Sequence, residues 1–192
     1  MLDKNEAVAI FTEAGALLQG HFRLTSGRHS DQYMQCAQVL KYPDKTEQLA
    51  RHLAEAFQDD AVELVVGPAM GGIIVSYEVA RQLKVPGIFT ERENGQMALR
   101  RGFTIQPGQR VLVVEDVVTT GGSVQEVMDV VRAAGGQVVG VGVLVDRSGG
   151  KVDFGVKTQA VLTMDIQSWE PEQCPLCAEG KLPVVKPGSR SL

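Results

Sequence analysis

The sequence predicts an α/β fold in which a central parallel β-sheet is flanked by helices. Apolar runs of strand length alternate with amphipathic segments of helix length through the middle of the chain, which is the pattern of parallel strands joined by crossover helices. The runs are apolar at successive positions, as expected for strands that are covered on both faces. Glycine and polar residues follow several runs, and ligands on such sheets bind at the carboxyl ends of the strands.

The chain begins with a predicted helix. Asp3 and Glu6 have the spacing of a helix cap, and Gly20 is expected to end the helix. The residues expected to face inward recur at helical spacing: Ala7, Ile10, Phe11, Ala14 and Leu17. One face of this helix should therefore be buried.

Two further features precede the sheet. Residues 22–35 contain two short strand candidates, joined by a turn at Ser26-Gly27-Arg28. Asp44 begins a second helix, which carries its apolar residues on one face: Leu49, Leu53 and Phe57.

The alternating region follows. Strands are predicted near residues 62–66, 86–89, 111–115 and 138–145, and helices near residues 72–84 and 123–134. In the second of these helices Ser123 and Glu126 have capping-box spacing, and Gly135-Gly136 ends the apolar periodicity.

Composition favours a single globular domain over residues 1–192. The chain has 44% apolar and 22% charged residues, near the globular norm, and can bury one sizeable core. Its net charge of −4, with Lys and Arg scattered along the chain, gives no basic surface for nucleic acid. The N-terminus lacks a secretory pattern and no apolar stretch approaches about 18 residues, so we expect a cytoplasmic protein that does not bind membranes.

The most informative segment is residues 111–123. Four apolar residues end at Glu115 and Asp116, where we expect the strand to stop, and hydroxyl and glycine residues then lead into a helix. Such a loop offers backbone N–H groups to an anion, while adjacent carboxylates accept hydrogen bonds from sugar hydroxyls. No Lys follows the glycines and no dinucleotide fingerprint is present. The segment predicts a site for a ribose 5-phosphate, and a plain strand-turn-helix with a solvated acid pair is the less favoured alternative.

The same segment resembles the 5-phosphoribosyl 1-pyrophosphate (PRPP) signature of the type I phosphoribosyltransferases. That signature is an apolar run, two acids, two apolar residues, Thr, a small residue, Gly, and then Thr or Ser. By this resemblance the PRPP-binding residues are Glu115, Asp116, Val117, Val118, Thr119, Thr120, Gly121, Gly122 and Ser123. From about residue 5 to its end the chain is similar to the orotate phosphoribosyltransferases within that family.

The resemblance implies a type I phosphoribosyltransferase fold, with a PRPP-binding core at about 60–150. A small hood would be formed by residues of about 20–40 and the C-terminal tail. The implied reaction transfers the 5-phosphoribosyl group from PRPP to orotate, giving orotidine 5′-monophosphate and pyrophosphate in de novo pyrimidine biosynthesis. The resemblance further implies Mg²⁺, bound mainly through PRPP, and a homodimer.

A second glycine-rich turn follows the strand at 62–66. Its backbone can approach another anionic group, and in the family this is the pyrophosphate loop. The residues concerned are Ala69, Met70, Gly71 and Gly72. Many relatives carry a Lys where Gly71 stands, so charge neutralisation by a Lys is absent here. A tight turn at the start of a helix is the alternative.

Arg147 follows the strand at 138–145. A guanidinium at a strand end can direct two donors onto a planar carboxylate, the group that separates orotate from uracil. The resemblance makes Arg147 the partner of the orotate carboxylate and places Thr119 near the same substrate. The alternative is a surface pair of Asp146 with Arg147.

The segment 90–103 is charged and contains glycine, which predicts a mobile loop. Arg92, Arg100 and Arg101 would stabilise pyrophosphate charge when this loop closes. Better-known relatives place several Lys and a His here, and this chain has neither residue type from 85 to 110. Solvated arginines are therefore an equally supported alternative.

The segment around the turn at 26–28 resembles the family's substrate hood. Its candidate residues are Ser26, Gly27, Arg28, Tyr33 and Met34. Thr25 stands where a Lys is usual, and Tyr33 with Met34 matches a pair that is aromatic at both positions in relatives. A plain hairpin with a packed Tyr33 is the alternative.

Cys174 and Cys177 have zinc-knuckle spacing, but a tetrahedral site needs four ligands and no second C-x-x-C exists. We therefore predict no metal site unless two subunits share one. The preferred interpretation is a loosely packed tail with reduced thiols, anchored by Trp169. The three histidines, His21, His29 and His52, have no visible acid or metal partner and are expected on the surface.

Two other functions remain open. A purine or uracil phosphoribosyltransferase would share the PRPP loop but has no use for Arg147 or the hood. A PRPP-sensing regulator on the same fold would bind nucleic acid, which the acidic charge balance disfavours.

Overall fold

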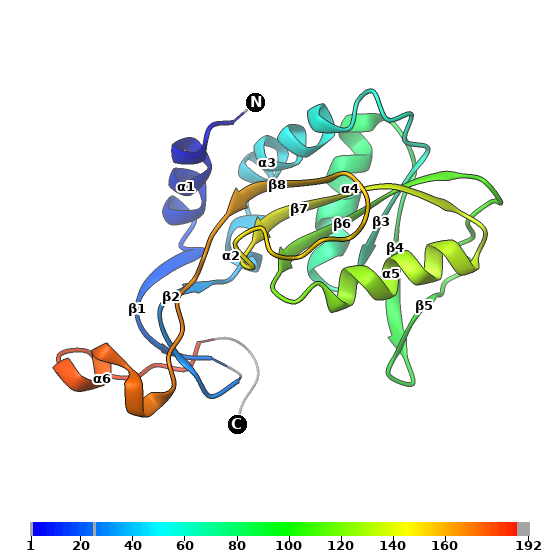
Figure 1. The fold of residues 1–192 in the computed structure, drawn as a ribbon. Coiled ribbons are helices and arrows are strands. Elements are labelled where there is room, and N and C mark those ends of the chain that lie inside the picture. Colours follow the sequence, from blue (N-terminus) through cyan, green and yellow to red (C-terminus); the bar gives the residue numbers. More distant parts are fainter. Residues whose placement is uncertain (1, 25, 188–192) are drawn as a thin grey trace.

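The structure is a computed structural model and describes residues 2–24 and 26–187 (Figure 1). Its centre is a six-stranded sheet of order β5-β4-β3-β6-β7-β8, in which every neighbouring pair is parallel except β4 and β5. The strands are β3 (Leu64–Pro68), β4 (Gly87–Glu93), β5 (Gln96–Leu99), β6 (Arg110–Val118), β7 (Gln137–Asp146) and β8 (Thr158–Thr163). The predicted parallel sheet is confirmed, with two edge strands that the sequence analysis did not predict.

Helices cover both faces of this sheet. The helices are α1 (Lys4–Glu13), α2 (Ala37–Leu40), α3 (Pro43–Ala56), α4 (Gly71–Leu83) and α5 (Gly122–Ala133). Helices α1 to α4 pack on one face and α5 on the other. Helix α4 joins β3 to β4, and α5 joins β6 to β7, as in crossover connections of parallel strands.

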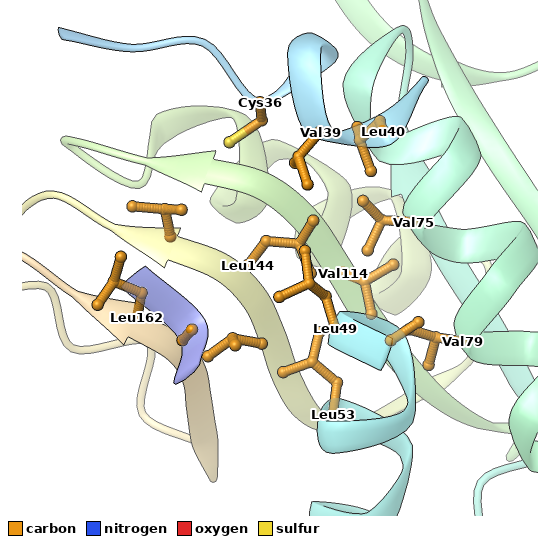
Figure 2. Packing of buried hydrophobic residues seen from close by; sticks show 14 of the residues in the cluster. Cys36, Val39, Leu40, Leu49, Leu53, Val75, Val79, Val114, Leu144 and Leu162 are labelled. Atoms are coloured by element: carbon orange, nitrogen blue, oxygen red, sulfur yellow. The ribbon is translucent and has the colours of Figure 1, made fainter. Parts of the chain in front are cut away.

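The apolar run of β6 divides its side chains between two cores. Leu112 and Val114 point into the core below α1 to α4, part of which Figure 2 shows, whereas Val111 and Val113 point toward α5. Successive side chains of a strand face opposite sides of a sheet, so a strand covered on both sides must be apolar at every position. This is why the run was recognisable in the sequence.

The first helix is shorter than predicted. The capping box of Asp3 and Glu6 is present, but α1 ends at Glu13 and not near Gly20. Leu17 is the first residue of strand β1 (Leu17–Arg23), where it pairs with Met34 of β2 (His29–Met34). Pairing with a distant strand overrides the helical spacing of Leu17, and the sequence contains no local signal of that pairing.

A separate hairpin carries the predicted hood. Strands β1 (Leu17–Arg23) and β2 (His29–Met34) confirm the two strand candidates, and they form a two-stranded sheet of their own. The C-terminal segment lies beside them, with η1 (Pro171–Gln173) and α6 (Pro175–Glu179) next to the hairpin in Figure 1.

The segment at 90–103 is a second hairpin for most of its length, so the prediction of a loop was wrong there. Strand β4 continues to Glu93 and pairs with β5 across Asn94-Gly95. Asn-Gly is the preferred sequence of a two-residue hairpin turn. Among the described residues, no helix is long and apolar enough to cross a membrane.

Candidate active site at the carboxyl ends of the strands

The predicted PRPP segment lies at the junction of β6 and α5. The acid pair does not end the strand as expected, because Val117 and Val118 continue the pairing with β7. Glu115 and Asp116 therefore lie within the last residues of β6. Consecutive strand residues face opposite sides, and Glu115 accordingly faces the cavity on the α5 side.

The loop after β6 encloses a polar cavity of about 180 Å³, which is lined by Glu115 and by the residues from Val117 to Val124. Thr119, Thr120 and Ser123 are exposed at its rim. Helix α5 begins at Gly122, and its N-cap Gly121 makes no side-chain cap bond, so the predicted capping box of Ser123 was wrong. The first N–H groups of a helix have no acceptor within the helix, and here they border the cavity.

Gly121 can be replaced by no other residue without strain. Its φ of +80° is the left-handed conformation, and a Cβ there would lie 2.8 Å from Val152 Cγ1 and 2.9 Å from Phe154 Cε1. The loop after β7 thus packs directly against the loop after β6. This contact places the loops at the carboxyl ends of β6 and β7 next to each other.

The acid pair is held in a low-dielectric environment. Burial, together with the charge of Asp116, raises the pKa of Glu115 to about 9. Burial also raises the pKa of Asp116 above its ordinary value. Backbone N–H groups offset part of the cost: Asp116 N–H donates to Glu115 Oε1 at 3.0 Å, and Val117 N–H donates to Asp116 Oδ1 at 2.7 Å. The pair is therefore suited to ligands that supply hydrogen-bond donors or positive charge.

The turn at residues 69–72 lies against this acid pair. A Cβ on Gly71 would lie 2.2 Å from Asp116 Oδ2, so the carboxylate occupies the space that any side chain at position 71 would need. The end of β3 is fixed at the same place, because Ala69 N–H donates to Thr90 O on β4 at 2.7 Å. The two glycine-rich turns therefore meet at Asp116, which the sequence analysis did not predict.

Arg147 follows β7 directly and lies next to the PRPP loop, where its backbone N–H donates to Val118 O at 2.8 Å. Its Nε is buried and finds no acceptor among the described residues. Burial lowers the pKa of the guanidinium. The alternative of a pair with Asp146 is not found, because that carboxylate accepts from the N–H groups of Ser148 and Gly150 at 2.7 and 2.9 Å. A buried donor without an acceptor points to an anionic ligand.

Comparison with known proteins identifies the family of this site. Residues 37–172 match the family described as "Phosphoribosyl transferase domain". The chain is 60% identical over 191 residues to an orotate phosphoribosyltransferase of Desulforamulus reducens, covering 100% of both chains. It is 63% identical, with the same coverage, to that of Pelotomaculum thermopropionicum. The chain belongs to the orotate phosphoribosyltransferase family.

Solved structures agree with this assignment. An orotate phosphoribosyltransferase from Aeropyrum pernix superposes with a TM-score of 0.65 at 31% identity, covering 82% of this chain and 93% of that one. The Mycobacterium tuberculosis orotate phosphoribosyltransferase in complex with inorganic phosphate gives a TM-score of 0.67 at 26% identity, covering 82% and 95%. The predicted type I phosphoribosyltransferase fold is confirmed.

The predicted hood residues differ from one another in their surroundings. Arg28 is engaged by the C-terminal segment, since it donates to Ser168 Oγ at 2.9 Å and pairs with Glu170. Tyr33 is half-buried and lies close enough to Arg147 to influence the pKa of that guanidinium. Met34 is buried in the core below α1 to α4. Ser26 and Gly27 form the turn, and Thr25 lies outside the described residues.

The three arginines of the β4–β5 region are all paired with acids at the surface. Arg92 contacts Glu126 at 2.8 Å, Arg100 contacts Glu93 at 3.3 Å, and Arg101 contacts Glu91 at 2.7 Å. These contacts match the alternative of solvated arginines. A role for the three in pyrophosphate binding stays a prediction.

The surface placement of the histidines was wrong. His21, His29 and His52 are only 2%, 7% and 7% exposed. His52 accepts a hydrogen bond from Leu2 N–H at 3.1 Å, and the other two contact the cysteines of the tail. Cys36 was also missed as part of the site: its buried thiol donates to Asp116 O at 3.5 Å. A lone Cys or His in a sequence gives no signal of such contacts.

Proposed function

We propose that this protein transfers the 5-phosphoribosyl group from PRPP to orotate, forming orotidine 5′-monophosphate and releasing pyrophosphate, as a cytoplasmic step of de novo pyrimidine biosynthesis. The observation that carries the choice of acceptor is the buried Nε of Arg147, which has no acceptor among the described residues and lies beside the proposed PRPP loop. Relatives named orotate phosphoribosyltransferase along the full chain support the same choice.

The PRPP loop binds the donor substrate. The N–H groups at the start of α5 and the hydroxyls of Thr119, Thr120 and Ser123 hold the 5-phosphate in the polar cavity. Glu115 and Asp116 accept hydrogen bonds from the ribose hydroxyls. Because Asp116 also touches the turn at 69–72, the backbone of that turn is close to the pyrophosphate end of PRPP.

Mg²⁺ would be held at this site mainly through PRPP. Its preferred ligands are oxygens, and the carboxyl groups of Glu115 and Asp116, whose pKa values are raised by burial, fit such a complex. When bound, the ion neutralises the charge that develops on departing pyrophosphate.

The reaction is a substitution at the anomeric carbon and needs no covalent nucleophile. The bond from the orotate ring nitrogen to the anomeric carbon forms while the bond to pyrophosphate oxygen breaks, through a transition state with oxocarbenium character. The proton of the ring N–H leaves with the departing pyrophosphate. Arg147 fixes the orotate carboxylate with Thr119 nearby, so that the ring nitrogen is in line with the breaking bond. Tyr33 and the hood restrict the access of water that would hydrolyse PRPP.

The test is an acceptor comparison. Protein, PRPP and Mg²⁺ are incubated with orotate, uracil or adenine, and nucleotide formation is followed by chromatography. We expect orotidine 5′-monophosphate, with uracil and adenine used poorly. Equal turnover of uracil would contradict the orotate assignment, and a gel shift with nucleic acid in the absence of any turnover would favour the PRPP-sensing alternative.

We further propose that the protein is a homodimer. Three large apolar side chains on α4 and the turn before it are spaced at i, i+4 and i+7 and are 82%, 44% and 69% exposed: Met70, Ile74 and Tyr77. A contiguous apolar stripe next to a binding loop suits a second copy of the chain. Light scattering after size exclusion should give twice the mass of 20.7 kDa. Tyr77→Glu should shift the protein toward monomer, and a monomeric wild-type chain would overturn this proposal.

A further inference from the structure

Two histidines of the hood hairpin and two cysteines of the tail converge on one point. His21 lies on β1 and His29 on β2, whereas Cys174 and Cys177 lie at the start of α6 and within it. One ligand atom from each residue lies within 4.8 Å of the other three. Cys177 and His29 are separated by 148 residues in the sequence, so the fold alone creates this cluster.

Three S···N distances in this cluster match those of a tetrahedral metal site. Zn–S bonds of about 2.3 Å and Zn–N bonds of about 2.0–2.1 Å at tetrahedral angles separate S from N by about 3.5 Å. The distances from His21 Nε2 to the two sulfurs are 3.4 and 3.6 Å, and Cys177 Sγ lies 3.3 Å from His29 Nδ1. The two nitrogens are 2.9 Å apart, and small side-chain rotations would open this distance.

Hydrogen bonds to His21 Nε2 cannot account for all the groups that contact this nitrogen. His21 Nδ1 lies 3.1 Å from the carbonyl of Leu182 and is the natural donor to it, which leaves one lone pair on Nε2. Three groups converge on that nitrogen: His29 Nδ1, Cys174 Sγ and Cys177 Sγ. One lone pair cannot accept from three donors. A cation at the centre satisfies all four atoms, and the contact with Leu182 then orients His21 as outer-shell contacts do for metal-bound histidines.

The tail also has little apolar burial to hold it in place. Among the described residues after Leu162, Cys174 is the only buried apolar one. The remaining attachment to the hairpin is polar. Backbone pairs join Trp169 to His29 and Val185 to the 21–23 segment, and the side chains of Arg28 and Ser30 bind residues 167–170. Segments too small to form a core of their own are commonly held by a metal or by disulfides.

We propose that His21, His29, Cys174 and Cys177 bind one structural Zn²⁺, which fastens the C-terminal tail onto the hood hairpin. All four protein ligands fill the tetrahedral shell, so the ion has no open position for substrate. Its role is to hold the hairpin that carries Tyr33 in place over the acceptor site. This proposal does not depend on the identity of the acceptor base.

The decisive measurement is metal content. Untagged protein, purified under reducing conditions without added metal, is analysed by inductively coupled plasma mass spectrometry, and we expect one zinc per chain. Reduced, chelator-treated protein is then titrated with Co²⁺, which should give thiolate charge-transfer bands and the intense visible absorption of tetrahedral cobalt, saturating at one equivalent. Zn²⁺ should displace Co²⁺ and raise the melting temperature of the apoprotein.

The chain supplies matched controls. It contains three cysteines and three histidines, so Cys36 and His52 are the ones outside the cluster. Cys177→Ser and His29→Gln should lose stoichiometric zinc, while Cys36→Ser and His52→Gln should retain it. If the cluster variants do not fold, the Co²⁺ titration of the wild-type chain still shows whether the four residues bind one metal ion. A reduced wild-type protein that binds neither ion at one equivalent, or a Cys174–Cys177 disulfide in the freshly purified active protein, would overturn the proposal.

Discussion

Replacing Arg147 by Ala should remove the contact that selects orotate. The side chain lies at the end of β7, its buried Nε has no acceptor among the described residues, and its neighbour Asp146 is used by other groups. A bidentate contact between a guanidinium and a carboxylate costs about 2–5 kcal/mol when one partner is cut away. Because Arg147 is only partly buried, we take the lower part of this range, about 2–3 kcal/mol, which corresponds to a fall of about 30- to 150-fold in kcat/KM for orotate.

The assay separates the two substrates. Steady-state kinetics with varied orotate measure the acceptor contact. Calorimetry with PRPP measures binding at the proposed donor site, residues 115–123, which should keep its affinity. Arg147→Lys keeps the charge but loses the planar pair of donors. Its kcat/KM for orotate should therefore lie between those of the wild type and Arg147→Ala. Arg132→Ala is the matched control, because Arg132 is an exposed arginine on α5 that pairs with Asp129.

Stability provides an independent measurement. Burial lowers the pKa of Arg147, which means that burying this charge lowers the free energy of unfolding of the ligand-free protein. Arg147→Ala should therefore leave the melting temperature unchanged or slightly higher. Unchanged orotate kinetics in a folded Arg147→Ala protein would refute the reasoning, and the carboxylate would then have to be bound elsewhere.

Three other predictions concern the acid pair and its neighbour. Glu115→Gln combined with Asp116→Asn should lower turnover by orders of magnitude without unfolding the protein, since each charge-assisted contact contributes about 1.5–3 kcal/mol; near-normal turnover would mean that the acids are merely solvated. Burial raises the pKa of Glu115 to about 9 in the folded protein, whereas the ordinary value is 4.5. The free energy of unfolding of the ligand-free protein should therefore fall as pH rises between these values. Chemical denaturation at several pH values should show a weaker pH dependence of this free energy in Glu115→Gln. Gly71→Ala should lower PRPP affinity, because its Cβ would lie 2.2 Å from Asp116 Oδ2, and calorimetry that finds unaltered affinity would contradict the packing described for this turn.

The elements that the sequence predicted well are those whose local pattern has one physical explanation. The run at 111–114 is apolar at every position because both faces of β6 are covered, and this pattern distinguishes a buried strand from an amphipathic one. Strand β8 was missed because only two of its six residues, Val161 and Leu162, are buried. An edge strand of this kind has no continuous apolar run to recognise.

Elements whose position depends on distant partners were predicted less well. Leu17 fits a helical spacing, yet it belongs to β1 because Met34 is available for pairing. Ser123 has capping-box spacing, but the helix already begins at Gly122. His21 and His29 are buried only because the tail returns to the hairpin, and no window of the sequence contains both partners.

Gly71 and Asp116 illustrate why single positions are difficult to interpret alone. In the sequence, Gly71 is simply the absence of a Lys that many relatives carry. In the structure, the Asp116 carboxylate fills the space beside Gly71. The position of this acid therefore requires that residue 71 has no side chain. A Lys at position 71 would have to displace the carboxylate that we propose contacts the ribose. Positive charge for the departing pyrophosphate must therefore come from groups outside this turn, and within the proposed mechanism the Mg²⁺ that arrives with PRPP is the group that supplies it.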